Sequence, residues 1–132
     1  MSLPKQILRR AIGYSGKIKT TKGGLCHFRS LLELRCITLL DKSDKVEYFI
    51  VEPKNLKIPY EVKAQGKTYH KKYTPDVFVK FTDGTKAVFE VKPSSQKKWM
   101  LNIFKWSKAK KILESAGISF FIVDDNALKG FL

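Results

Sequence analysis

Two short apolar segments that flank an Asp-Gly pair constrain the fold of this chain more than any other feature of its sequence. Residues 76–81 and 85–92 have the apolar and β-branched composition of strands. Asp83-Gly84 lies between them, and such a pair is typical of a hairpin turn. The sequence therefore predicts an antiparallel hairpin here.

The length of the turn decides where the acids of this hairpin point. A two-residue loop would place Asp76 and Glu90 on opposite faces, because side chains alternate along a strand. A three-residue loop pairs Phe81 with Thr85, and Asp76 then lies directly opposite Glu90. Gly84 would occupy the third loop position, which requires a positive φ. We therefore predict the three-residue loop, with the two acids as cross-strand neighbours.

The remaining apolar spacing predicts a chain that mixes helices and strands. Apolar residues recur at helical intervals over residues 28–40, and a second helical pattern runs from about residue 94 to residue 116, before Gly117. Other apolar segments predict strands over residues 46–51, 56–62, 67–74 and 118–123. This order of elements indicates one α/β domain, in which helices flank a mixed sheet.

The charge of the chain points to a polyanionic partner. Lys and Arg total 26 against 12 Asp and Glu, which gives a formal net charge of +14. Residues 1–24 and 92–111 contain no acid. Because clustered cations release counterions when they meet phosphates, we expect a nucleic acid, with a merely soluble cationic surface as the alternative. We interpret residues 1–26 as a flexible basic arm and residues 27–132 as the folded domain.

The hydropathy of the chain argues against a membrane protein. No apolar run approaches the ~20 residues that span a bilayer, and the N-terminus lacks a signal peptide's apolar stretch. We expect no membrane contact and a cytoplasmic location. Cys26 and Cys36 have no metal-binding spacing and are expected to be free thiols.

The predicted hairpin gathers groups that suit a divalent cation. Glu90 and Lys92 point to the same face because they are alternate residues of one strand. With Asp76 opposite Glu90, two carboxylates and an ammonium meet at one end of the sheet. Adjacent carboxylates repel, and Mg²⁺ commonly binds one or two carboxylates together with substrate phosphate. We therefore predict a catalytic metal site; the alternative is an ordinary strand surface with a Glu90–Lys92 ion pair.

These residues resemble a known nuclease motif. Tyr73-Thr74-Pro75-Asp76 followed by Glu90-Val91-Lys92 resembles the PD-(D/E)XK motif and is especially similar to TnsA-type transposon endonucleases. The pattern also resembles short phage endonucleases of the junction-resolving and head-completion types. Phe28-Arg29-Ser30-Leu31-Leu32-Glu33 matches the helix that carries a further Glu in those relatives. The resemblance implies a restriction-endonuclease-like fold and a phosphodiesterase that cleaves DNA with Mg²⁺, or with Mn²⁺ as a substitute.

The resemblance also implies a role for each site residue. Asp76 and Glu90 would hold the metal together with the carbonyl oxygen of Val91. Glu33 would bind a second metal or a water on the metal, and Lys92 would assist the nucleophile. We expect phosphate contacts from basic side chains, namely Arg9, Arg10, Lys17, Lys19, Lys22, Arg29, Lys71, Lys72, Lys97 and Lys98.

Several alternatives stay open at this point. The chain fits a stand-alone nuclease of a phage or mobile element, in a bacterium or a phage-infected host cell, and a structure-selective junction resolvase fits the same residues. A non-catalytic basic DNA-binding module is a further alternative. A homodimer, or a transposition or packaging partner, is compatible with each of them. We expect Glu52 and Glu61 to lie outside the site, and Trp99 and Trp106 to lie in the core.

Overall fold

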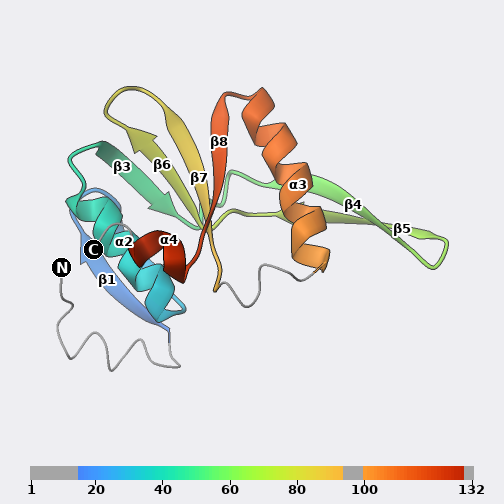
Figure 1. The fold of residues 1–132 in the computed structure, drawn as a ribbon, viewed down its shortest axis with the longest axis horizontal. Coiled ribbons are helices and arrows are strands. Elements are labelled where there is room, and N and C mark those ends of the chain that lie inside the picture. Colours follow the sequence, from blue (N-terminus) through green and yellow to red (C-terminus); the bar gives the residue numbers. More distant parts are fainter. Residues whose placement is uncertain (1–14, 94–99, 130–132) are drawn as a thin grey trace.

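The computed structural model describes residues 15–93 and 100–129 and contains a central four-stranded sheet with two separate two-stranded sheets (Figure 1). The central sheet has the order β3-β6-β7-β8. Its strands are β3 (Val46–Val51), β6 (Val77–Phe81), β7 (Lys86–Val91) and β8 (Ile118–Val123). The first three are antiparallel, and β8 runs parallel to β7. The mixed sheet confirms the predicted α/β, restriction-endonuclease-like fold class.

Helices cover both faces of this sheet, and each face has its own apolar cluster. On one face, α2 (Leu31–Lys42) and α4 (Asp125–Lys129) pack on valines that include Val79 and Val91. On the other face, α3 (Met100–Ser115) packs Trp106 and Leu113 against Val88 and Phe120. Figure 1 shows α2 and α4 on the opposite side of the sheet from α3. Trp106 is buried in the core as predicted, whereas Trp99 lies outside the described residues.

The β6–β7 hairpin has the predicted three-residue loop. The Phe81 N–H donates to the Thr85 carbonyl at 2.9 Å, and the Gly84 N–H donates to the Phe81 carbonyl at 3.0 Å. Gly84 has a φ of 92°, a conformation that glycine adopts without a steric cost. The ladder pairs Val77 with Phe89, so the same register carries Asp76 to a position opposite Glu90. The prediction for the hairpin is confirmed.

The N-terminal region differs from the flexible arm that we predicted for residues 1–26. Strands β1 (Gly16–Thr20) and β2 (Gly24–Phe28) form an antiparallel hairpin, and Cys26 and Phe28 are buried in the cluster beneath α2. Asp41 ties this hairpin to the domain, since its carboxylate accepts the Thr21 and Lys22 N–H groups at 3.0 and 2.8 Å. The interleaved glycines and lysines obscured an alternating apolar pattern. Residues 1–14 lie outside the described part.

One helix boundary and one short helix also differ from the sequence prediction. Helix α2 begins at Leu31 rather than residue 28, because Ser30 has an extended backbone and its side chain caps the Glu33 N–H. The short helix α4 was not predicted. Asp124 accepts the Ala127 N–H at 2.7 Å and so caps this helix. Both cysteines are free and buried, as predicted.

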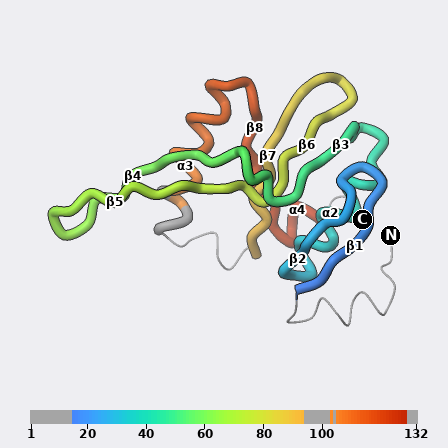
Figure 2. The backbone as a smooth tube through the Cα atoms, turned by 180° about the vertical axis from the view of Figure 1, so that it is seen from behind, coloured from blue at the N-terminus to red at the C-terminus, as the bar shows by residue number. Residues whose placement is uncertain are grey.

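Strands β4 (Ile58–Ala64) and β5 (Lys67–Tyr73) form a sheet of their own. The predicted strand over residues 56–62 is shifted by two residues, and the turn is the pair Gln65-Gly66, both with a positive φ. Such a pair is typical of a type I′ hairpin turn. Figures 1 and 2 show this hairpin extending away from the central sheet. None of the described helices is long and apolar enough to span a membrane.

We predict that Gly84→Ala lowers the free energy of unfolding by about 1–2 kcal/mol, because an L-residue is strained at this positive φ. A Cβ at this position would meet nothing within 4 Å, so the cost comes from the backbone alone. Urea unfolding measures it. Gly84→Asn is the control and should lose less, since Asn tolerates the left-handed region better. Equal stability of Gly84→Ala and the wild type would contradict the assigned loop.

Candidate active site

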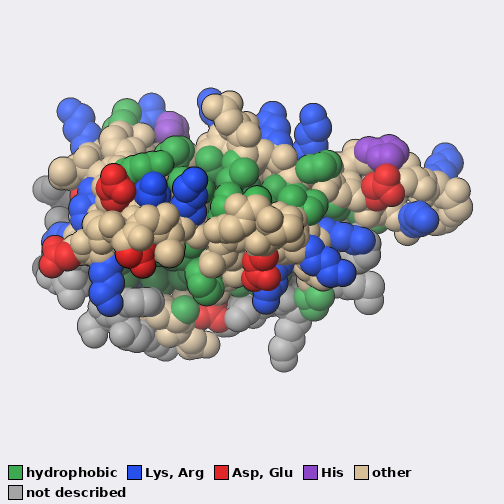
Figure 3. All heavy atoms as spheres, turned by 90° about the horizontal axis from the view of Figure 1, so that it is seen from above, with side chains coloured by type: hydrophobic (Ala, Val, Ile, Leu, Met, Phe, Trp, Pro, Cys, Tyr) green, Lys and Arg blue, Asp and Glu red, His purple; other side chains and the backbone are tan. Residues whose placement is uncertain are grey.

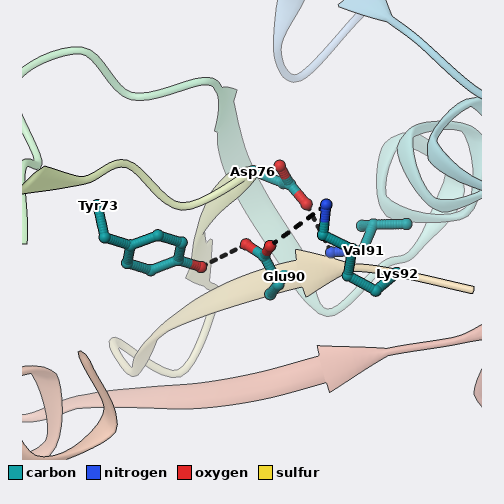
Figure 4. Close-up of polar contacts among 5 residues, drawn as sticks. All are labelled: Tyr73, Asp76, Glu90, Val91 and Lys92. Carbon is teal, nitrogen blue, oxygen red and sulfur yellow. Dashed lines mark hydrogen bonds and ion pairs between the residues drawn. The ribbon is translucent and has the colours of Figure 1, made fainter. Parts of the chain in front are cut away.

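Three of the predicted site residues meet at one end of the central sheet (Figure 4). Asp76 directly precedes β6, Glu90 lies near the end of β7, and Lys92 follows that strand. The Val91 N–H donates to Asp76 Oδ2 at 2.7 Å, and this bond fixes the orientation of the Asp76 carboxylate. Lys92 Nζ lies 4.0 Å from Glu90 Oε1. The hairpin register thus gathers two carboxylates and one ammonium, as the sequence predicted.

Glu90 is the most deeply buried of these groups and has a hydrogen-bond partner that the sequence did not indicate. Only 3% of Glu90 is exposed. The Tyr73 hydroxyl, from the end of β5, donates to Glu90 Oε2. Lys105 from α3 places its ammonium 5.2 Å from the centroid of the Tyr73 ring. Tyr73 belongs to the PD-(D/E)XK-like motif, but the resemblance assigned it no function. No pattern in the sequence indicated a role for Lys105.

Both central carboxylates are destabilised in their charged form, mainly by burial. Burial raises the pKa of Asp76 to about 6, and the neighbouring Glu90 charge adds to that rise. The Val91 N–H, Lys92 and Lys105 act in the opposite direction. Burial also raises the pKa of Glu90, against the opposing effects of the Tyr73 hydroxyl and the Lys105 charge. The nearby cations and hydrogen-bond donors therefore do not fully offset the effect of burial on either carboxylate.

Glu33 approaches the same site from the other layer of the fold. Its carboxylate accepts the Arg29 N–H at 2.7 Å and, with Asp76, lines a small pocket of about 10 Å³. Burial is the main cause that raises the pKa of Glu33, and the charges of Asp76 and Glu52 contribute. A pocket of this volume holds about one water molecule. The structure thus brings Glu33 close enough to interact with Asp76.

Glu52 also lines this pocket, contrary to our expectation that it would lie outside the site. It directly follows β3 and has a φ of 51°, and its N–H donates to the Asp76 carbonyl at 2.7 Å. Arg29 Nη1 lies 3.0 Å from Glu52 Oε1. No local sequence pattern indicates the left-handed conformation of Glu52. Glu61, by contrast, pairs with His70 at 3.3 Å on the β4–β5 hairpin and does not line the pocket.

The donor set fits a small divalent cation. Asp76 and Glu90 supply carboxylate oxygens from adjacent strands, and each carboxylate has one oxygen hydrogen-bonded to the protein, which holds it in place. Burial is the main cause of their raised pKa values, and a bound cation would favour the charged forms. Within the described residues there is no cluster of three or more His, Cys, Asp or Glu side chains with metal-binding geometry. Mg²⁺ needs only one or two carboxylates, since water and phosphate complete its shell.

The predicted phosphate-binding residues lie in several places. Lys17 and Lys19 on β1 and Lys71 and Lys72 on β5 are exposed, whereas Lys22 Nζ donates to the Ser43 carbonyl. Figure 3 shows lysine and arginine side chains spread over the face seen from above, including the projecting hairpin. Arg29 is exposed but paired with Glu52. The remaining members of the set lie outside the described residues, namely Arg9, Arg10, Lys97 and Lys98.

Comparison with known families agrees with this geometry. The family model of the TnsA-like endonuclease N-terminal domain matches residues 43–125. The chain belongs to this family. It is a PD-(D/E)XK family, so the protein is a nuclease by descent, and the matched TnsA-like region contains Tyr73, Asp76, Glu90 and Lys92. Glu33 precedes the matched region. A search of curated proteins returned no significant match.

We predict that Tyr73→Phe raises the pKa of Glu90, because the lost hydroxyl is a donor that stabilises the Glu90 carboxylate. Carboxyl ¹³C NMR titration of the metal-free protein measures this pKa. Tyr69→Phe on the same strand is the control, since Tyr69 is exposed and pairs with Val62 rather than with an acid. An unchanged Glu90 pKa in Tyr73→Phe would contradict the assigned hydrogen bond.

We predict that Asp76→Asn stabilises the metal-free protein at pH 7.5 by about 1–2 kcal/mol. The pKa of Asp76 is raised to about 6 in the folded state, so its contribution to stability is fully present below about pH 4 and is lost as the pH rises through 6. A neutral amide avoids that loss and still accepts the Val91 N–H. Thermal unfolding in EDTA at pH 7.5 and pH 4 tests this. A gain of equal size at both pH values would contradict the role of the charge.

Proposed function

We propose that this protein is a divalent-metal-dependent DNA endonuclease that hydrolyses phosphodiester bonds, with Mg²⁺ as its cofactor and Mn²⁺ as a substitute. One observation carries the proposal, namely the hairpin register that puts Asp76 opposite Glu90 with Lys92 beside them. Membership of a nuclease family supports it independently. The positive charge of the chain, +14, favours a polyanionic substrate.

Asp76 and Glu90 are the residues that would hold the cation, together with the carbonyl oxygen of Val91. The Val91 N–H and the Tyr73 hydroxyl keep the two carboxylates in position before any metal arrives. When bound, a divalent cation lowers the pKa of its water ligand and stabilises the negative charge on the scissile phosphate. Glu33, on the far side of the small pocket, would hold a second cation or a water molecule.

Lys92 would act directly on the reacting groups. Its side chain is about one-third exposed, at 31%, and it is held near Glu90 without a short hydrogen bond. The ammonium can therefore orient the attacking water or stabilise the charge that develops on the phosphate. Attack in line with the leaving group would leave 5′-phosphate and 3′-hydroxyl ends, as the resemblance implies. A homodimer, or a transposition or packaging partner, stays a prediction, as does the phage or mobile-element setting.

We predict that Asp76→Ala and Lys92→Ala each reduce plasmid nicking in Mg²⁺ by about 10²-fold or more, because each removes a group that acts at the transition state. Agarose gels of supercoiled plasmid measure nicking, and fluorescence anisotropy in EDTA measures DNA binding. Binding should persist in both variants and should weaken as salt is raised.

Lys86→Ala is the matched control. It removes one exposed lysine at the opposite end of β7, so nicking should stay within about twofold of the wild type. Nicking by the wild type in EDTA at the rate seen in Mg²⁺ would contradict metal dependence. Full nicking by Asp76→Ala and Lys92→Ala would contradict the assigned site.

A further inference from the structure

The β4–β5 hairpin is anchored at its base and exposed along the rest of its length. Ile58 and Tyr73, which pair with each other, are buried against α3. Beyond this base, every residue of β5 from Lys67 to Lys72 is exposed. An isolated two-stranded hairpin is only marginally stable in water, so the buried base is what holds it in place. Figures 1 and 2 both show it projecting beyond α3.

The register sorts the side chains of the hairpin into two faces. Residues that pair across the strands point to the same face, so Lys71 lies with Tyr60, and Tyr69 lies with Val62. Alternate residues of a strand point to the same face. In β5 one such set is Lys67, Tyr69, Lys71 and Tyr73. We call the row Lys67–Tyr69–Lys71 the Tyr69 face. It leads directly to Tyr73, whose hydroxyl holds the catalytic Glu90.

The opposite face is less suited to a polyanion. It carries Lys63 and Lys72 but also Glu61, whose carboxylate lies 3.3 Å from His70 Nδ1. The Tyr69 face has no acid. Tyr69 is also 45% exposed there, so an aromatic ring stands between two free lysines. On a duplex, lysine and tyrosine side chains both contact phosphate oxygens, so an exposed tyrosine between two lysines suits a phosphate backbone.

We propose that the β4–β5 hairpin is a DNA-binding ribbon and that its Tyr69 face lies against the duplex next to the phosphate that is cleaved. The major groove of B-DNA admits a two-stranded ribbon. The seven residues from Lys67 to Tyr73 span about 20 Å at the usual rise of a strand. This length corresponds to roughly six base pairs of duplex beside the site. The inference rests on the proposed function for the identity of the substrate.

Charge complementarity favours DNA over a protein as the occupant of this face. The hairpin from Ile58 to Tyr73 contains four lysines and a single glutamate. The cores of protein–protein interfaces are depleted of lysine and are more apolar than this face. A second copy of the chain would bring the same positive charge and would be repelled.

The test compares two double variants that lose the same charge. Lys67→Ala/Lys71→Ala removes both lysines of the Tyr69 face, and Lys63→Ala/Lys86→Ala removes two exposed lysines elsewhere. Fluorescence anisotropy with a duplex oligonucleotide in EDTA measures binding from about 0.05 to 0.5 M salt. Two lost phosphate contacts should reduce the salt slope by about 1.8 and weaken binding about thirtyfold near 0.15 M salt. The control double variant should bind within about threefold of the wild type.

The outcomes of this test distinguish failure of the DNA-binding ribbon from failure of the nuclease assignment. Equal weakening by both double variants, or none by Lys67→Ala/Lys71→Ala, would overturn the ribbon. A change in solution mass for this variant alone would show a contact between copies and would also overturn it. Circular dichroism checks that both variants fold. Because binding is measured in EDTA, a wild type that binds through the Tyr69 face but never nicks plasmid in Mg²⁺ would refute the proposed function and leave the ribbon supported.

Discussion

The close approach of two carboxylates, one half-buried and one buried, is the constraint on which the site depends. Asp76 and Glu90 face each other because the β6–β7 loop has three residues, and Gly84 is what permits that loop. Several polar neighbours stabilise the charged forms of the pair. The Val91 N–H bonds to Asp76 and the Tyr73 hydroxyl bonds to Glu90. The pKa of Asp76 nevertheless stays raised, mainly by burial, so a positive charge placed beside the two carboxylates would stabilise their ionised forms.

The position of this pair, at the end of the sheet, lets both layers of the fold contribute. Glu33 and Glu52 reach the small pocket from α2 and β3, on the side of the first apolar cluster. Tyr73 and Lys105 act on Glu90 from the side of α3. A buried acid is costly where a well-packed apolar residue would fit, so the two clusters have to supply the stability that the acids reduce. The site is therefore rigid because its neighbours on both faces are packed, not because its own charges attract one another.

Sequence reasoning succeeded where a local rule fixed the geometry. Turn chemistry gave the β6–β7 register, and strand alternation then placed Glu90 and Lys92 on one face. It failed where tertiary contacts decided the outcome. Nothing local indicates that Glu52 takes a left-handed conformation and turns toward Asp76, or that Lys105 lies over Tyr73. The strands β1 and β2 were missed because glycines and lysines separate their few apolar residues. Only the contacts of those apolar residues with α2 show which side of the hairpin is buried.

Tyr73 connects the exposed β4–β5 hairpin to the buried site. Its ring is packed at the base of the hairpin with Ile58 and against Phe120, at a centroid distance of 6.4 Å, while its hydroxyl reaches Glu90. A change in the tilt of the hairpin would have to move this ring, and the packed core resists such a movement. The direction in which β4 and β5 project is therefore fixed relative to Asp76 and Glu90. A surface that must meet a substrate at a set distance from reacting groups needs this kind of anchor, since a hairpin on a flexible loop would bring no defined phosphate to the site.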